Sequence, residues 1–167
     1  IALDSPKRLV DTRVSGGRFG SSSTSGVSVL RLKVAGATTV KGVASGLPAT
    51  GIGAVAMNVT VVEGKDKDGY GFVTVYPCAS ASTPVPDASN LNFAGGQTVP
   101  NSVLAPLSAD GYVCFSVYGD THLLVDVSGY VPAGTGLTAL DSPKRLVDTR
   151  VSGGRFGSSS MSGVSVL

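Results

Sequence analysis

The residues best suited to acid–base chemistry lie in the segment "THLLVDVSGY", which contains the only histidine of the chain, His122. On a β-strand His122, Asp126 and Ser128 share one face, which raises the question of a serine–histidine–aspartate arrangement. Positions four and six residues further along a strand lie roughly 13 and 20 Å away, too far for hydrogen bonds between them. The chain also lacks the GxSxG pattern of a nucleophile elbow. We therefore expect no catalytic residue and no enzymatic activity.

Charged residues in apolar strands are the next candidates. Asp126 lies in the apolar run "LLVDVSGY", and Asp11 and Arg13 are two residues apart in "RLVDTRV", hence on one face of a strand. A carboxylate buried in such a strand needs a partner, and Arg13 or Arg8 can supply one with two parallel hydrogen bonds. The pattern favours a structural ion pair among Asp11, Arg13 and Asp126; a ligand-binding carboxylate is the alternative.

The chain has two cysteines, Cys78 and Cys114. Two thiols with a single histidine and no CxxC motif make a poor zinc site. A disulfide is favoured over two buried free thiols, and it would close a long loop worth roughly 3–4 kcal/mol. Disulfides persist in oxidising compartments, so this pairing points outside the cytoplasm.

Three acidic residues, Glu63, Asp66 and Asp68, precede a glycine in "EGKDKDGYG", faintly like the start of a calcium loop. The bidentate glutamate that closes such a loop is missing, and two lysines dilute the negative charge. A solvated hairpin turn is the better interpretation. We expect neither a metal ion nor another cofactor.

Amide side chains gather in "SNLNFAGGQTVPN", at Asn90, Asn92, Gln97 and Asn101. Amides near glycine and proline commonly satisfy irregular backbone that a sheet cannot pair. They also orient sugar hydroxyls in lectins, with Phe93 or a nearby tyrosine as a stacking platform. A scaffold role is favoured, and the stretch remains the best candidate for glycan binding.

These side chains must be positioned by β-strands. The chain has 23 glycines and much serine, threonine and valine, and no stretch shows a sustained helical period. About eight or nine short strands, each with one buried face, predict an all-β, two-sheet β-sandwich of immunoglobulin-like or jelly-roll topology. The expected strands are residues 7–14, 27–34, 53–62 and 70–77, short strands around Leu91/Phe93 and Val103/Ala105, and a terminal hairpin over 111–131 turning at Gly119-Asp120. The polar stretch "KDKDG" is expected to form another hairpin turn.

A long internal duplication organises the chain. Residues 2–30 return at 139–167 with one difference, Thr24 replaced by Met161, at an offset of 137 residues. We therefore expect tandem repeats: residues 1–137 as one complete sandwich unit and residues 138–167 as the N-terminal portion of the next, with "PAGTG" as linker. We also expect residues 139–150 to be well packed, for instance as a strand added to an open sheet edge.

Composition narrows the range of partners. The formal net charge is +2, only 14% of residues are charged, and no basic stripe is visible, so nucleic-acid binding has little support. No apolar run is long enough to span a membrane, so we expect no membrane insertion in this fragment. Low charge, absence of tryptophan and positive mean hydropathy fit an extracellular or cell-surface β-protein.

Six motifs in order carry a family resemblance: "PKRLVDTR", "AVAMNVTVV", "GFVTVYPC", "SNLNFAGGQTVPN", "GYVCF" and "THLLVDVSGY". Together they resemble a poorly characterised tandem-repeat β-domain of secreted and cell-surface proteins of actinobacteria and related bacteria. The resemblance covers residues 6–131 and implies a β-rich accessory module with Cys78 and Cys114 as its paired cysteines. It implies no catalytic residue.

The sequence thus predicts an extracellular structural tandem-repeat domain that builds a surface fibre, stalk or sheath. Its expected partners are neighbouring repeats or copies of itself. The alternative is an accessory module that binds cell-wall polysaccharide or another glycan, although the aromatic supply is thin, with five tyrosines and five phenylalanines.

Overall fold

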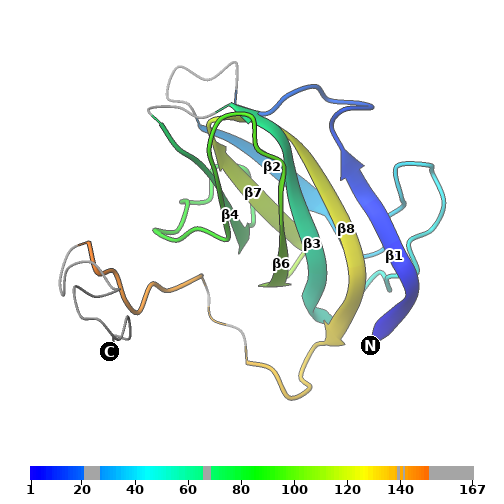
Figure 1. Cartoon of the computed structure of the whole chain (residues 1–167). Coiled ribbons are helices and arrows are strands. Elements are labelled where there is room, and N and C mark those ends of the chain that lie inside the picture. The colour runs from blue at the N-terminus through cyan, green and yellow to red at the C-terminus, as the bar shows by residue number, and fades with distance from the viewer. Residues whose placement is uncertain (21–26, 66–68, 139, 141, 151–167) are drawn as a thin grey trace, which may run out of the picture.

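The computed structural model describes residues 1–20, 27–65, 69–138, 140 and 142–150, and the strands between residues 2 and 132 form an all-β sandwich (Figure 1). Eight strands make up two four-stranded antiparallel sheets packed face to face, as the sequence predicts. The strands are β1 (Ala2–Asp11), β2 (Val27–Lys33), β3 (Ile52–Lys65), β4 (Gly71–Pro77), β5 (Leu91–Phe93), β6 (Val99–Pro106), β7 (Tyr112–Tyr118) and β8 (Asp120–Pro132). The described part of the chain contains no helix long and apolar enough to cross a membrane.

The strand order is that of a jelly roll. One sheet has the order β1-β8-β3-β6 and the other β2-β7-β4-β5. The first strand therefore pairs with the last, the second with the seventh, the third with the sixth and the fourth with the fifth. This nested pairing wraps one antiparallel ribbon into two sheets, which decides between the two topologies that the sequence left open.

The core lies between the sheets and follows the two-residue period of a strand. Along β3, Val55, Met57, Val59 and Val61 are all buried, and the same alternation recurs on the facing strands. Further fully buried residues of this core come from β4, β7 and β8, among them Val73, Val113, Phe115, Val117, Leu123 and Val127.

Two expected hairpins are wrong. β3 and β4, and likewise β7 and β8, lie in opposite sheets, so neither pair is hydrogen-bonded. Their connections cross between the layers, as a jelly roll requires. The turn at Gly119 is nonetheless real: its φ of 103° is the left-handed conformation that glycine adopts without strain. Glycine and polar residues therefore predict where the chain reverses direction, but they do not predict which sheet the next strand joins.

The first strand also differs from its expected range of 7–14. It begins at Ala2 and ends at Asp11, where the chain enters a turn closed by the Val14 and Ser15 amides, which donate to the Asp11 carbonyl. The polar residues at its start are held by main-chain pairing, since Ala2 lies opposite Gly129 and Lys7 opposite Val127. Alternation alone could not place an edge strand with so little buried surface.

The stretch that is duplicated in the sequence supplies sheet edges. It contains all of β1 and the first four residues of β2, and these two strands are edge strands of the two different sheets. In the second copy, residues 140 and 142–150 form no strand, and Leu146 is 93% exposed. The expected well-packed environment for this segment is therefore wrong.

Sheet pairing explains the difference between the two copies. In the described residues there is one β8, and β1 already occupies its free edge. The second copy instead runs past β6 and the loop after β4, where Leu140 and Pro143 line a cavity with Leu104 and Pro106. Arg145 of the same segment lies 3.5 Å from Asp87 in the loop after β4, and this exposed ion pair contributes little to stability.

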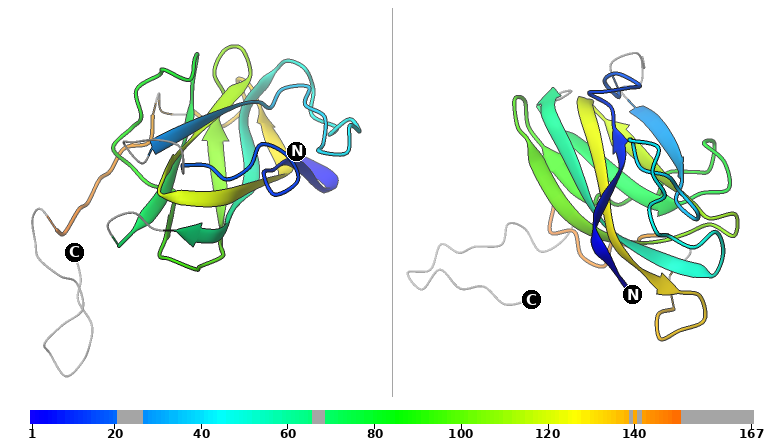
Figure 2. Two further views of the ribbon diagram at one scale, coloured as in Figure 1. Left: turned by 90° about the horizontal axis from the view of Figure 1, so that it is seen from above. Right: turned by 90° about the vertical axis from the view of Figure 1, so that its right-hand side faces the viewer.

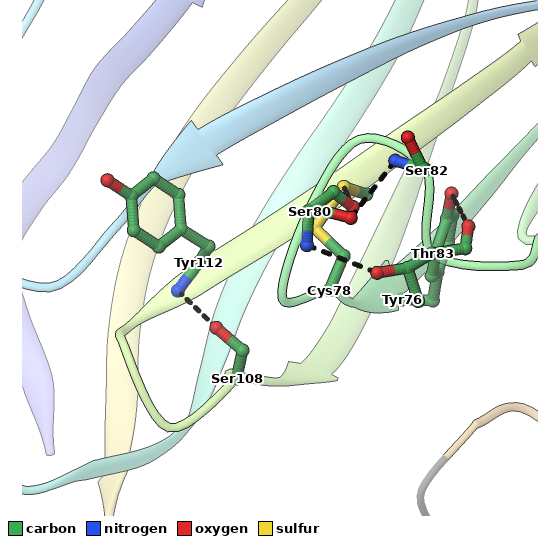
Figure 3. Close-up of a disulfide and its surroundings, with 8 residues drawn as sticks. Tyr76, Cys78, Ser80, Ser82, Thr83, Ser108 and Tyr112 are labelled. Carbon is green, nitrogen blue, oxygen red and sulfur yellow. Dashed lines mark hydrogen bonds between the residues drawn. A yellow bond between two sulfur atoms is a disulfide. The ribbon is translucent and has the colours of Figure 1, made fainter.

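The expected disulfide is confirmed. Cys78, just after β4, is bonded to Cys114 of β7, and both are buried with Tyr76 in a small cluster on the outer side of the second sheet (Figure 3). Next to it, Ser80 and Ser82 form a tight turn in which the Ser82 amide donates to the Ser80 hydroxyl at 3.2 Å. The bond fastens the start of the long β4–β5 connection to the neighbouring strand.

We expect replacement of both cysteines by serine to lower the free energy of unfolding by about 3–4 kcal/mol. The reason is that the bond joins residues 36 apart, and opening a loop of this length returns chain entropy to the unfolded state. Urea unfolding of the two proteins gives the difference. Equal midpoints for the double variant and the oxidised parent would contradict the prediction.

Candidate functional site

A cluster of charged residues joins the two ends of the chain at the β1–β8 pairing. Arg8 lies opposite Asp126 in the ladder and donates from Nε and Nη2 to the two carboxylate oxygens at 2.8 and 2.9 Å. Its Nη1 donates to Asp11 at 3.2 Å. Of the two arginines that the sequence offered to Asp126, Arg8 is therefore the partner, and it bridges both carboxylates.

Asp11 is the buried member of this cluster, 5% exposed. Arg13 donates to its two oxygens from Nε at 2.9 Å and Nη2 at 2.7 Å, and the Arg13 amide donates to Oδ1 at 3.1 Å. These bonds from Arg13, with a smaller effect from Arg8, hold the pKa of the Asp11 carboxyl below its ordinary value. The expected Asp11–Arg13 pair is present, so the group acts as a structural anion.

The geometry behind that pair differs from the expectation. Arg13 does not share a strand face with Asp11, because β1 ends at Asp11 and Arg13 lies in the following turn. The carboxylate accepts the amide of the residue two positions on, which is the usual way for aspartate to begin a turn. The contact is therefore local and independent of any sheet.

His122 does not assemble a catalytic group. Its Nδ1 lies 3.3 Å from the Thr12 hydroxyl, which itself accepts the Leu123 amide at 2.9 Å. Ser128 donates to the Ala56 carbonyl at 3.3 Å on the adjacent strand. These contacts join the turn after β1, β8 and β3, and none of them links histidine to serine or aspartate.

Arg18 provides a further anchor that sequence reasoning missed. Its Nε donates to Asp120 Oδ1 at 2.8 Å and its Nη2 to the Glu63 carbonyl at 2.5 Å. The next residue, Phe19, exchanges two main-chain hydrogen bonds with Thr121. The loop after β1 is thereby fastened to the start of β8. Nothing in its Gly/Ser-rich composition signals this contact, because the partners lie 45 and 102 residues away in the sequence.

The amide cluster divides into scaffold and surface. The Asn90 side chain accepts the Val75 amide at 2.7 Å, Gln97 accepts the Ala94 amide at 2.9 Å, and Asn101 donates to the Asn90 carbonyl. These three amides satisfy irregular backbone around β5, as favoured from the sequence. Asn92 differs: it is exposed and donates to the Ser89 hydroxyl at 3.3 Å.

The suggestion of Phe93 as a stacking platform is wrong. Phe93 is 4% exposed and belongs to the core. Its ring lies against Gly64 and Gly71, where an added Cβ would come within 2.4 and 2.3 Å of ring atoms. Two glycines distant in sequence thus make the space that the ring fills.

A different aromatic surface lies on the second sheet. The rings of Tyr70, Phe72 and Tyr118 stack in nearly parallel planes, with centroids 5.3 to 6.3 Å apart. Tyr70 is 54% exposed. With Asn92, the 85–89 loop, and Arg145 and Arg150 of the second copy, Tyr70 and Phe72 line an open cleft of about 470 Å³. We call this the aromatic cleft; its first signal in the sequence is the two-residue spacing of Tyr70 and Phe72.

The suggested calcium loop is only partly visible. Glu63 has its carboxylate 3.8 Å from Arg18 and a left-handed φ of 52°, whereas Asp66 and Asp68 lie outside the described residues. Within the described ranges, no group of three or more His, Cys, Asp and Glu side chains is placed to hold a metal ion.

Comparison with known protein families, curated proteins and solved structures gives no significant match to this chain. The functional argument therefore rests on its own residues.

We expect Asp11→Asn to lower the free energy of unfolding at neutral pH by roughly 2–3 kcal/mol, because a charged, hydrogen-bonded partner of two arginines is lost. Since the pKa of Asp11 is lowered in the folded chain, the unfolded chain takes up this proton first as pH falls. The contribution is complete above about pH 5 and is lost progressively as pH falls from there towards the lowered pKa of the folded chain.

Urea unfolding between about pH 2 and 7 measures this, and Asp11→Asn should show a flatter decline of stability at the acid end than the parent. Asp87→Asn is the matched control, since its side chain is 98% exposed. Identical acid profiles for the parent and Asp11→Asn would contradict the assigned role.

Proposed function

We propose that this chain is part of an extracellular structural array, in which jelly-roll units follow one another through short linkers and build a surface fibre, stalk or sheath. The observation that carries the proposal is the second copy of the β1 sequence, six residues beyond the end of β8. A sandwich unit needs the strand β1, and the sequence of β1 recurs shortly after the last strand of this unit. No catalytic role is proposed.

The behaviour of the two copies supports this view. Residues 142–148 have the same sequence as residues 5–11, yet only the first set is a strand, and it is the set that lies beside β8. The second set lacks a partner strand. A following unit would bring its own β8 and give the second copy the role that β1 has here.

Two further properties support an extracellular or cell-surface location. The buried Cys78–Cys114 disulfide is of the kind that persists in oxidising compartments. The low content of charged residues also fits this setting. The resemblance to secreted actinobacterial repeat domains agrees with it and forms part of the proposal. The proposed partners are neighbouring repeats and copies of the same chain.

Electron microscopy of the native protein tests the array. We expect elongated particles or filaments with a regular axial repeat of one sandwich unit. A recombinant protein in which residues 1–137 are followed by a second full copy of residues 1–137 gives a direct comparison. Its second unit should fold and melt cooperatively. An unfolded second unit, or native particles without an axial repeat, would rule the array out.

A second candidate function is glycan binding, favoured by the aromatic cleft. Stacked, partly exposed rings next to an exposed amide are suited to the apolar face and the hydroxyls of a pyranose. Asn92 is the one residue of the amide cluster with this placement, beside Tyr70 and Phe72.

Sedimentation with insoluble peptidoglycan and polysaccharide tests this candidate. We expect saturable binding that Tyr70→Ala weakens about two- to tenfold, since stacking on an aromatic ring is worth about 0.5–1.5 kcal/mol. Tyr112→Ala is the aromatic control, because Tyr112 lies at the opposite end of β7 from Tyr118, about 20 Å along the strand. If Tyr70→Ala binds as tightly as Tyr112→Ala, the aromatic cleft is excluded as the glycan-binding site.

A further inference from the structure

The edge of β8 that β1 covers is a binding site for one particular strand. β3 covers one side of β8 and β1 the other. The β1 side recognises its strand through three features: Arg8 clamps Asp126, Leu9 is buried in the core, and Asp11 lies opposite Leu124. Main-chain pairing supplies affinity in such a site, and the alternate side chains supply specificity.

The second copy carries the same three residue types, but they make other contacts: Arg145, the equivalent of Arg8, donates to Asp148 at 3.2 Å and to Asp87 at 3.5 Å. Asp148 accepts the Arg150 amide at 3.1 Å and Nε at 2.8 Å, which matches the Asp11–Arg13 arrangement at 3.1 and 2.9 Å. Leu146, the equivalent of Leu9, is 93% exposed where Leu9 is 8% exposed. The Asp148–Arg150 turn therefore matches the turn that follows β1, whereas residues 142–148 form no strand.

The second copy can also reach this site within its own unit. The start of β1 lies beside the end of β8, where the Ile1 amino group donates to the Tyr130 carbonyl at 2.7 Å and the Tyr130 amide donates back to Ile1 (Figures 1 and 2). The 137-residue offset would put Thr138 in the place of Ile1. The two strands would then be joined by residues 131–137, a connection of seven residues that is somewhat longer than the usual hairpin loop and includes the last two residues of β8.

We propose that the β8 edge takes residues 142–148 in place of residues 5–11 of the same unit, so that one chain holds two overlapping complete sandwiches. One uses β1 to β8. The other uses β2 to β8 followed by the second copy, a circular permutation of the first. The inference depends on the duplication and deepens the proposed array, because each unit in it could take this strand from its own start or from its successor.

Connectivity explains which form is present. The two forms make the same strand contacts, so the difference in free energy comes from what is attached to each strand. Thr12, Arg18 and Phe19, which bond the turn after β1 to β8 and β3, recur in the second copy as Thr149, Arg155 and Phe156, so they do not separate the two forms. The first copy alone continues into β2 of this sandwich. The first copy is therefore the resident strand, and the second becomes resident when the first is damaged.

A double-mutant cycle on the full chain tests the exchange. Leu146→Asp alone should leave the melting temperature unchanged, because this side chain is exposed. Leu9→Asp alone should cost only a few degrees, because the intact second copy takes over. The double variant should melt roughly 10 °C or more below the parent, since no intact strand remains.

Hydrogen exchange supplies a second readout. In Leu9→Asp, the amides of residues 145–148 should exchange at least about a hundredfold more slowly than in the parent. Leu9→Asp melting as low as the double variant would overturn the proposal, as would fast exchange of these amides. A concentration-dependent dimer of Leu9→Asp would show insertion between molecules and would also overturn it. Because every measurement is made on monomers, failure of the array would leave these results unaffected.

Discussion

The pairing of the first strand with the last is the contact on which the sandwich depends. Arg8 and Asp126 are 118 residues apart, and their bidentate pair joins the two ends of a ribbon that has wrapped through both layers. β8 is an interior strand only because β1 covers it. Without β1, the main-chain donors and acceptors along one edge of β8 would be unpaired, and the core would lose the packing of Leu9. In the turn and loop after β1, Thr12, Arg18 and Phe19 also form hydrogen bonds with β8.

The strands themselves were largely predictable, because alternating side chains and turn residues are local signals. The second, fourth and seventh strands fall close to their expected ranges. The sheet to which each strand belongs was not predictable. A glycine turn such as the one at Gly119 gives the same sequence whether the next strand pairs with the last or crosses to the other layer. Two hairpins were predicted where the chain changes sheet.

The site residues divide along the same line. The Asp11–Arg13 pair and the disulfide could be proposed from residue types, since one is a local turn and the other the only pair of cysteines. Burial of Phe93 could not, because the space it fills is made by two glycines on other strands. The aromatic cleft required the register that brings Tyr118 of β7 against Phe72 of β4. Features that depend on pairing between strands distant in the sequence could not be predicted from the local pattern of residues.

That the duplicated stretch contains edge strands has a consequence for how such a gene can change. Recombination between the two copies would add or remove one period of 137 residues. The amino-acid sequence at the joint would stay the same, except that either Thr24 or Met161 is kept. In the proposed array, each period would supply this edge strand, so a crossover within it would give products that encode only whole domains. The length of the protein could therefore vary in steps of one unit while its fold stays constant.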